Sequence, residues 1–135
     1  MIISAGVEAA LIAHARRESP HECCGLLLGR ADAIVDSVPA ENADPDPSRR
    51  YLVSPRDHFA AIRLARARGL EVIGAYHSHP RSDPAPSASD VAEAFDEFLY
   101  VIIGLAPDPP QLRAWRLAAG NFVHVPLVRM GEVPG

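Results

Sequence analysis

Apolar residues near the start of the chain recur with the spacing of one helical face. Val7, Leu11 and Ala15 are each four positions apart, which places their side chains on the same side of a helix. Ser4 precedes them and is a residue type that caps helix N-termini. Because proline interrupts a helix, we expect this helix to end at Ser19-Pro20.

A second helix is predicted from residue 54 onward. Ser54 suits the N-cap and Pro55 the first helical position, and Asp57, three residues after the cap, completes the pattern of a capping box. Gly69 suits the C-terminus of this helix. The predicted inner face holds Phe59, Ile62 and Ala65, and the solvated outer face holds Arg63, Arg66 and Arg68.

A third helix is predicted to begin near Ser87 or Ser89, after a loop that Pro84 and Pro86 stiffen. The apolar residues that follow have the spacing of one buried stripe. They are Val91, Ala94, Phe95 and Phe98.

Between these helices lie short apolar runs that have the length of buried strands. They cover residues 23–28, 33–38, 70–76, 99–105, 112–118 and 122–128. Gly120-Asn121 is suited to joining the last two, and the polar residues 41–50 and 107–110 form loops. Strands interleaved with helices predict a mixed α/β fold.

The size of the chain predicts a single domain. A chain of 135 residues with 48% hydrophobic residues can bury one core without disulfides, so we expect a domain over residues 1–130 and a short tail over residues 131–135. Cys23 and Cys24 are adjacent, and neighbours in a strand point to opposite faces, which disfavours a bridge between them. This is the pattern of a reduced, cytoplasmic protein.

Charge and hydropathy exclude two classes of partner. The net charge of -4, without a basic stripe, argues against nucleic acid. The first residues lack the charged leader and apolar run of a signal peptide, and no stretch has the length of a membrane span. We therefore expect neither a nucleic-acid partner nor a membrane.

Candidate chemistry begins where the apolar run 70–76 ends. His77 and His79 are two positions apart, so in an extended strand both imidazoles project from one face, close enough to bind one cation. Neutral imidazole suits zinc, and a third protein ligand would leave a tetrahedral position open for water. Asp90, in the first turn of the third predicted helix, is the candidate third ligand.

Each part of this pattern has an alternative explanation. Ser87 and Asp90 also match a capping box, which needs no metal. A lone His-x-His is a weak signal, and Asp83 is a rival ligand, although it lies in the proline-rich loop. The combination at fixed spacing is more specific, and accident becomes the weaker explanation.

The spacing His77-Ser78-His79, seven residues, Ser87, two residues, Asp90 resembles the metal motif of the JAMM/MPN+ zinc metallopeptidases. The segment 20–29, in which Glu22 precedes Cys23-Cys24-Gly25, is similar to the glutamate segment of that family. The order of the predicted elements is also the order found in the family. The resemblance implies the MPN fold, a curved mixed sheet flanked by helices, with an architecture like that of cytidine deaminases.

The resemblance gives each of these residues a role. One zinc ion, held by His77, His79 and Asp90, would carry a water molecule as the nucleophile. Glu22 would act as general acid and base, and Ser87 would donate a hydrogen bond to the oxyanion. The reaction class is hydrolysis of an amide or isopeptide bond. The remaining histidines and both cysteines receive structural or surface roles, and these histidines are His14, His21, His58 and His124.

Small bacterial members that resemble this chain act on ubiquitin-like β-grasp sulfur carrier proteins and cleave after the C-terminal Gly-Gly. Some release cysteine and others trim the carrier, and both options stay open at this point. The family resemblance also admits a homodimer. Two alternatives remain: a catalytically silent MPN scaffold, against which the intact ligand set counts, and a zinc peptidase of the cell-wall or phage-tail type.

Overall fold

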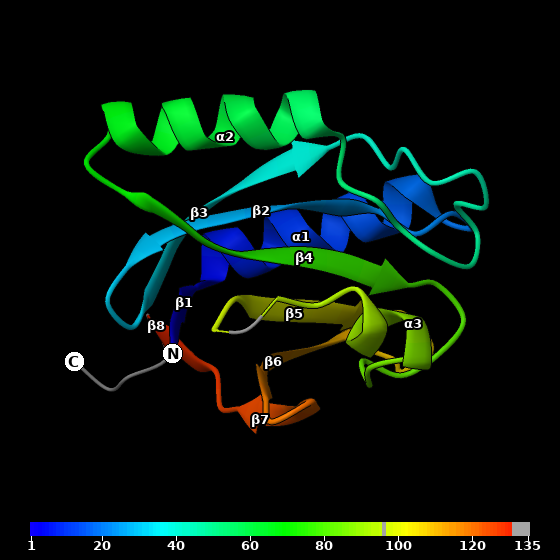
Figure 1. Cartoon of the computed structure of the whole chain (residues 1–135). Helices are drawn as coiled ribbons and strands as arrows, with labels where there is room; N and C mark the ends of the chain where they lie inside the picture. The colour runs from blue at the N-terminus through cyan, green and yellow to red at the C-terminus, as the bar shows by residue number, and fades with distance from the viewer. Residues whose placement is uncertain (96, 131–135) are drawn as a thin grey trace.

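Among the residues that the computed structural model describes, 1–95 and 97–130, eight strands form one mixed sheet. The strands are β1 (Ile2–Ser4), β2 (Cys24–Arg30), β3 (Ala33–Ala40), β4 (Glu71–His79), β5 (Leu99–Gly104), β6 (Gln111–Ala118), β7 (Asn121–Val125) and β8 (Val128–Met130). Their spatial order is β7-β6-β5-β4-β2-β3-β1-β8 (Figure 1). β4 is parallel to β5 and antiparallel to β2, so it lies in the interior of the sheet. The predicted mixed α/β fold is confirmed.

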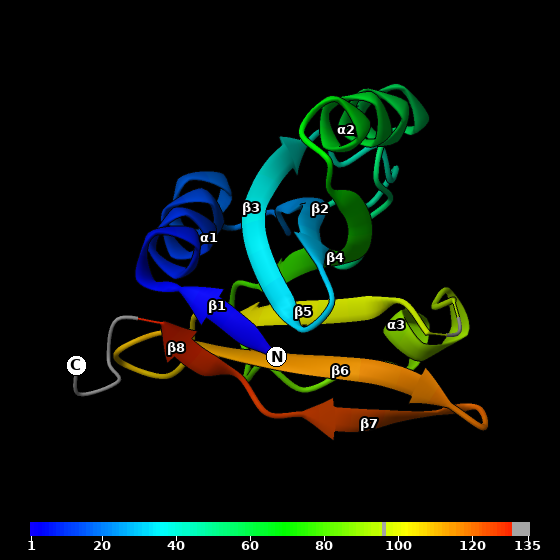
Figure 2. The ribbon, with the colours of Figure 1, turned by 90° about the vertical axis from the view of Figure 1, so that its left-hand side faces the viewer.

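Helices cover both faces of the central strands (Figure 2). They are α1 (Ala5–Glu18), α2 (Pro55–Ala67) and α3 (Ala88–Ala92). Successive residues of β2 point to opposite faces, so Leu27 joins the core cluster that contains Leu11 of α1. Leu26 and Leu28 join the cluster that contains Ala61 of α2. Two hydrophobic cores, one on each face, therefore fix β2 and β4 between the helices.

The first helix has the cap and the face that the sequence predicts. The Ser4 hydroxyl accepts a hydrogen bond from the Val7 N–H at 3.1 Å, and the helix ends at Glu18. The buried residues of α1 include Val7, Leu11 and Ala15. Both predictions are confirmed.

The second helix starts at the predicted proline, but its cap and inner face differ from the prediction. Ser54 makes no side-chain cap bond, and the Asp57 carboxylate accepts instead from the Glu41 N–H at 2.8 Å, which ties the helix to the preceding loop. Phe59 is 63% exposed, while Ala61 is fully buried. The small alanines let α2 approach the sheet closely, so the face with the bulky side chain turns outward.

The third helix is much shorter than the apolar stripe predicted. It ends at Ala92, and Phe95 is 72% exposed. Glu97 has a φ of 64°, a left-handed backbone that a helix cannot contain. Phe98 packs edge-on against Tyr100 of β5, with ring centroids 5.6 Å apart. The apolar residues after Ala92 therefore cover the sheet from an irregular segment.

The last predicted strand, 122–128, is in fact two strands. Pro126 interrupts it because proline has no N–H to donate to a ladder, and β8 pairs in parallel with β1. The sequence analysis did not predict β1. Because β7 and β8 lie at opposite ends of the strand order and only two residues separate them in sequence, the sheet curls until its edges approach one another (Figure 2).

Two expectations concern the limits of the chain. The predicted tail, residues 131–135, lies outside the described residues. None of the helices that the structure describes is long and apolar enough to cross a membrane.

Candidate metal centre

The end of β4 places two histidines on one face of the sheet. His77 and His79 have ring centroids 5.1 Å apart, and both are buried. Ser78 points to the opposite face, where its hydroxyl accepts a hydrogen bond from the Cys23 N–H at 2.8 Å. The strand is thereby held to the beginning of β2, and the two imidazoles share a fixed orientation.

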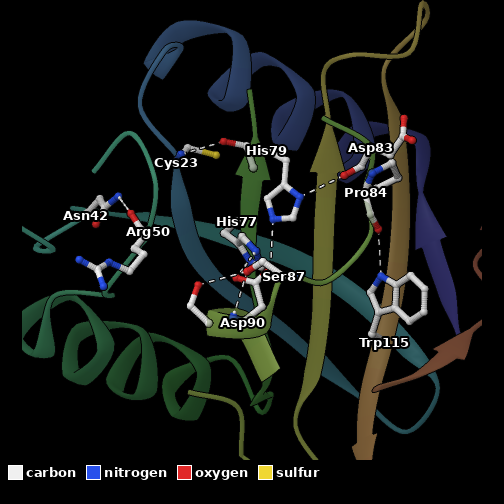
Figure 3. Close-up of polar contacts among 12 residues, drawn as sticks. Cys23, Asn42, Arg50, His77, His79, Asp83, Pro84, Ser87, Asp90 and Trp115 are labelled. Carbon is white, nitrogen blue, oxygen red and sulfur yellow. Dashed lines mark hydrogen bonds and ion pairs between the residues drawn. The ribbon is translucent and has the colours of Figure 1, made fainter. Parts of the chain in front are cut away.

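Asp90 approaches the histidine pair from the first turn of α3. Its Oδ1 lies 3.2 Å from His77 Nε2, and its Oδ2 lies 3.1 Å from His79 Nε2. One ligand atom from each of the three residues lies within 4.8 Å of the others, and all three residues are buried. Figure 3 shows the three side chains pointing toward one another. The structure therefore brings together the three residues predicted to bind metal.

The same Asp90 also belongs to a capping box. Its N–H donates to the Ser87 hydroxyl at 3.1 Å, and its Oδ2 accepts from the Ser87 N–H at 2.9 Å. The two explanations of the Ser-x-x-Asp pattern are therefore compatible. The cap fixes the carboxylate so that both of its oxygens face the imidazoles.

His79 is oriented by a second contact. Its Nδ1 lies 3.0 Å from the backbone carbonyl oxygen of Asp83, so this nitrogen must be the donor, and in the neutral ring Nε2 carries a lone pair. That lone pair faces an Asp90 oxygen, an arrangement that needs a proton or a cation between the two atoms. Burial lowers the pKa of His79, but the neighbouring Asp90 outweighs it and the net pKa is raised. The exposed Asp83 side chain is not part of the group.

His77 is a buried imidazole without hydrogen bonds. Neither of its ring nitrogens has a hydrogen-bond partner, and burial lowers its pKa, which keeps the ring neutral. A buried polar atom without a partner is costly unless something else binds it. Burial raises the pKa of Asp90, but the two facing imidazoles outweigh it and hold the pKa well below its usual range. Two imidazoles and one ionised carboxylate fit a divalent cation.

Glu22 lies beside this group, just before β2. It is buried, and its Oε1 has no hydrogen-bond partner. Burial raises the pKa of Glu22 to about 7, while His79 lowers it and Asp90 raises it further. A carboxyl group with this pKa can both accept and donate a proton at neutral pH.

Two hollows flank the ligand group and share no lining residue. The Asp90 hollow, of about 280 Å³, is lined by Asp44, Arg50, Tyr51, Leu52, Ser89, Asp90, Ala92 and Glu93. The Glu22 hollow, of about 250 Å³, is lined by Pro20, Glu22, Ser48, Arg49, His79, Pro80, Arg81, Ser82 and Ser87. The metal ligands therefore separate two openings, one on each side of the group.

One aromatic residue of the site was missed by the sequence analysis. Tyr51 stacks on His77, with ring centroids 4.2 Å apart and planes 16° from parallel. It follows a polar loop, and a single tyrosine there has no periodicity that could have indicated its role. Asn42 organises the same loop, because its Nδ2 donates to the carbonyl oxygens of Glu22 and Arg50 at 3.0 Å each (Figure 3).

The residues given structural roles lie where those roles require. His14 is buried, with Nδ1 2.8 Å from the Tyr76 hydroxyl, and His21 is exposed. Both cysteines are free and buried. Burial raises the pKa of Cys23 to about 11 and that of Cys24 to about 12, which keeps both thiols protonated and poor nucleophiles.

Comparison with known families and sequences gives a consistent result. The model of the family described as prokaryotic homologues of the JAB domain matches residues 4–118. A desampylase from Haloferax volcanii is 32% identical over 74% of this chain and 77% of its own length. A probable TtuB-protein conjugate cleaving protease from Thermus thermophilus is 37% identical over 82% of this chain and 72% of its own length. A CysO-cysteine peptidase from Mycobacterium tuberculosis is 28% identical over 94% and 89%.

Solved structures share the fold. A protein from Desulfitobacterium hafniense has a TM-score of 0.88 at 32% identity, over 98% of this chain and 94% of that chain. A JAB1/MPN domain protein from Archaeoglobus fulgidus has a TM-score of 0.61 at 20% identity, over 95% and 97%. The expected MPN-type fold is thereby confirmed.

Proposed function

The chain belongs to the family of prokaryotic homologues of the JAB domain, and on that premise we propose that it is a zinc-dependent peptidase acting on ubiquitin-like carrier proteins. It hydrolyses the amide bond that follows the C-terminal Gly-Gly of a β-grasp sulfur carrier. The relatives support a carrier conjugate as substrate, since their names refer to TtuB-protein conjugates and to CysO-cysteine.

One observation carries the proposal. Two imidazoles and a carboxylate converge in a buried group where His77 has no hydrogen-bond partner, next to the unpaired Oε1 of Glu22. A scaffold that only binds partners gains nothing from burying these polar atoms, and leaving them unsatisfied costs stability. A metallopeptidase needs all of them.

The chemistry follows from where each group lies. A zinc ion bound by His77, His79 and Asp90 supplies a Lewis acid for the substrate carbonyl and for water. Glu22 takes the proton of the attacking water and delivers it to the leaving amine. The Ser87 oxygen already accepts a hydrogen bond from the Asp90 N–H, and its own proton is available for the developing oxyanion.

The test is direct cleavage. Zinc-loaded protein is incubated with a β-grasp sulfur carrier extended beyond Gly-Gly, and the mass of the carrier is followed by mass spectrometry. We expect loss of the extension, which a chelator prevents and Glu22→Gln abolishes without loss of zinc. Zinc binding without cleavage of any carrier would instead support the silent scaffold. The homodimer stays a prediction, to be checked by light scattering.

A further inference from the structure

The two hollows beside the metal ligands differ in which part of a substrate they can receive, and this inference rests on the proposed function. The leaving amine must lie within reach of the group that protonates it. Glu22 lines only one of the two hollows, together with His79 and Ser87. The leaving group therefore occupies the Glu22 hollow, and the Gly-Gly tail enters from the Asp90 hollow.

The Glu22 hollow carries positive charge. Arg49 and Arg81 both line it. Arg81 forms no ion pair with any residue that the structure describes, and the exposed Arg49 guanidinium has only Asp46 at 3.8 Å. Two guanidinium groups thus stand beside a carboxyl group whose own charge is largely suppressed by burial.

The Asp90 hollow has the opposite character. Its free acidic group is Glu93, while Arg50 lies 3.9 Å from Asp44, so these two charges largely offset one another. An uncharged Gly-Gly segment needs no ion pair in this hollow. The cationic side of the site is therefore the side of the leaving amine.

We propose that the leaving group is a single amino acid with a free α-carboxylate, which Arg81, assisted by Arg49, recognises in the Glu22 hollow. In such an adduct the carboxylate is two bonds from the scissile nitrogen, so it stays within the hollow of about 250 Å³ when the nitrogen is beside Glu22. In an isopeptide the nitrogen is at the end of a lysine side chain, and no carboxylate accompanies it. The arginines thus favour release of an amino acid over cleavage of protein conjugates.

The reaction balances with water alone. The water oxygen bonds to the terminal glycine carbonyl carbon, and the bond from that carbon to the amino-acid nitrogen breaks. Glu22 passes the water proton to the nitrogen. The products are a carrier that ends in a free Gly-Gly carboxylate and a free amino acid.

Three probes test the proposal with the zinc-loaded protein. The first is a β-grasp sulfur carrier with one cysteine after Gly-Gly, the second is the same adduct with the cysteine carboxylate converted to an amide, and the third joins the carrier to a lysine side chain of a peptide. We expect kcat/KM about tenfold higher for the acid than for the amide, mostly through KM, because one charge-assisted hydrogen bond is lost. Binding of the acid and the amide to Glu22→Gln, measured without turnover, should show the same preference.

Variants assign the preference to the arginines. Arg81→Gln should reduce the preference for the acid to about twofold or less, and Arg49→Gln should reduce it partly, because its guanidinium is shared with Asp46. Arg63→Gln removes an equal charge from the exposed face of α2 and should change nothing.

The outcomes separate this proposal from the function on which it rests. Equal cleavage and equal binding of acid and amide, or faster cleavage of the isopeptide, overturn the recognition of the carboxylate while the peptidase remains. A preference unchanged by Arg81→Gln and Arg49→Gln overturns the assignment of the residues. Cleavage of none of the three probes overturns the proposed function, and this inference with it.

Discussion

Asp90 serves two structures with one carboxylate, because it caps α3 and faces both imidazoles. Asp90→Asn keeps an oxygen that can accept from the Ser87 N–H but removes the negative charge. We expect the variant to fold with little change in Tm and to lose zinc affinity by more than the roughly 10- to 100-fold typical of residues around a metal site. Competition with a chromophoric chelator measures this.

Ser87→Ala is the matched control for that experiment. It removes the side-chain cap, at a cost of about 1 kcal/mol in stability, but leaves the three ligand side chains intact. Zinc bound as tightly by Asp90→Asn as by the unaltered chain would contradict the ligand set.

Tyr51 covers one face of the His77 ring and excludes water from it. Tyr51→Phe keeps the stacked ring, so zinc affinity should be unchanged. Tyr51→Ala exposes the imidazole and frees its orientation, and we expect a loss of zinc affinity of about tenfold. Titration of the protein with Co²⁺, followed by its visible absorption, reports both the affinity and the geometry. Equal spectra and affinities for the two variants would exclude a positioning role.

Glu22 gives the peptidase a predicted pH dependence. Burial raises its pKa to about 7, and only the ionised form accepts a proton from water. The rate constant kcat/KM should therefore rise with pH through a limb at or below about 7, because a bound dication favours the ionised carboxylate. Pre-steady-state or steady-state rates from pH 5 to 8 locate the limb. A flat profile over that range would rule out Glu22 as the base.

The candidate site could be predicted mainly because its residues are close in sequence. The His-x-His pair, Ser87 and Asp90 lie on two consecutive elements, and a strand and a helix cap constrain their directions. Glu22 needed the family resemblance, since only the pairing of β2 with β4 brings it near. Tyr51 and the two arginines of the Glu22 hollow come from loops, where no periodicity constrains the side chains.

At the scale of elements, α1 is held to β4 by a buried polar pair. His14 lies against the Tyr76 hydroxyl, and burial, with help from Arg17, lowers the pKa of His14 below its usual 6.5. The unfolded chain therefore binds a proton below about pH 6.5 that the folded chain refuses, so this group destabilises the fold as pH falls and has no effect above that value. Its contribution vanishes in His14→Gln.

Urea denaturation at pH 7.5 and pH 5.5 measures this effect. We expect the fall in unfolding free energy between the two pH values to be smaller for His14→Gln than for the unaltered chain. Gln keeps a polar group near the tyrosine hydroxyl, so the comparison isolates the titration. An identical fall in both proteins would show that His14 is protonated as easily when folded.

The elements that were predicted well are those whose pattern depends on one face. The stripe of α1 and the fully buried runs of β4 and β5 follow directly from burial. The stripe of α3 was wrong because apolar residues that cover a sheet from an irregular segment have the same spacing as a helix. β1 and β8 are three-residue strands whose existence depends on a distant partner, which local patterns do not contain.

At the scale of the whole molecule, the curl of the sheet depends on how the chain ends. β8 pairs with β1, and its Arg129 forms an ion pair with Glu8 of α1. A chain that stops after Leu127 lacks these bonds and exposes the edge of β1 to other molecules. We expect unfolding free energy to fall by about 1–2 kcal/mol, Tm to fall by several degrees, and self-association to increase.

A chain that stops after Met130 is the matched control, because it keeps every described strand and removes only the predicted tail. Thermal unfolding followed by circular dichroism, together with size-exclusion chromatography, compares the two truncations. If both unfold at the temperature of the full chain, β8 does not secure the edge of β1, and the domain ends earlier than residue 130. If both lose stability equally, residues beyond 130 belong to the domain and the predicted boundary is wrong. Only a loss confined to the shorter chain supports a domain that β8 closes, with the metal ligands held in the interior of the sheet, far in strand order from either edge.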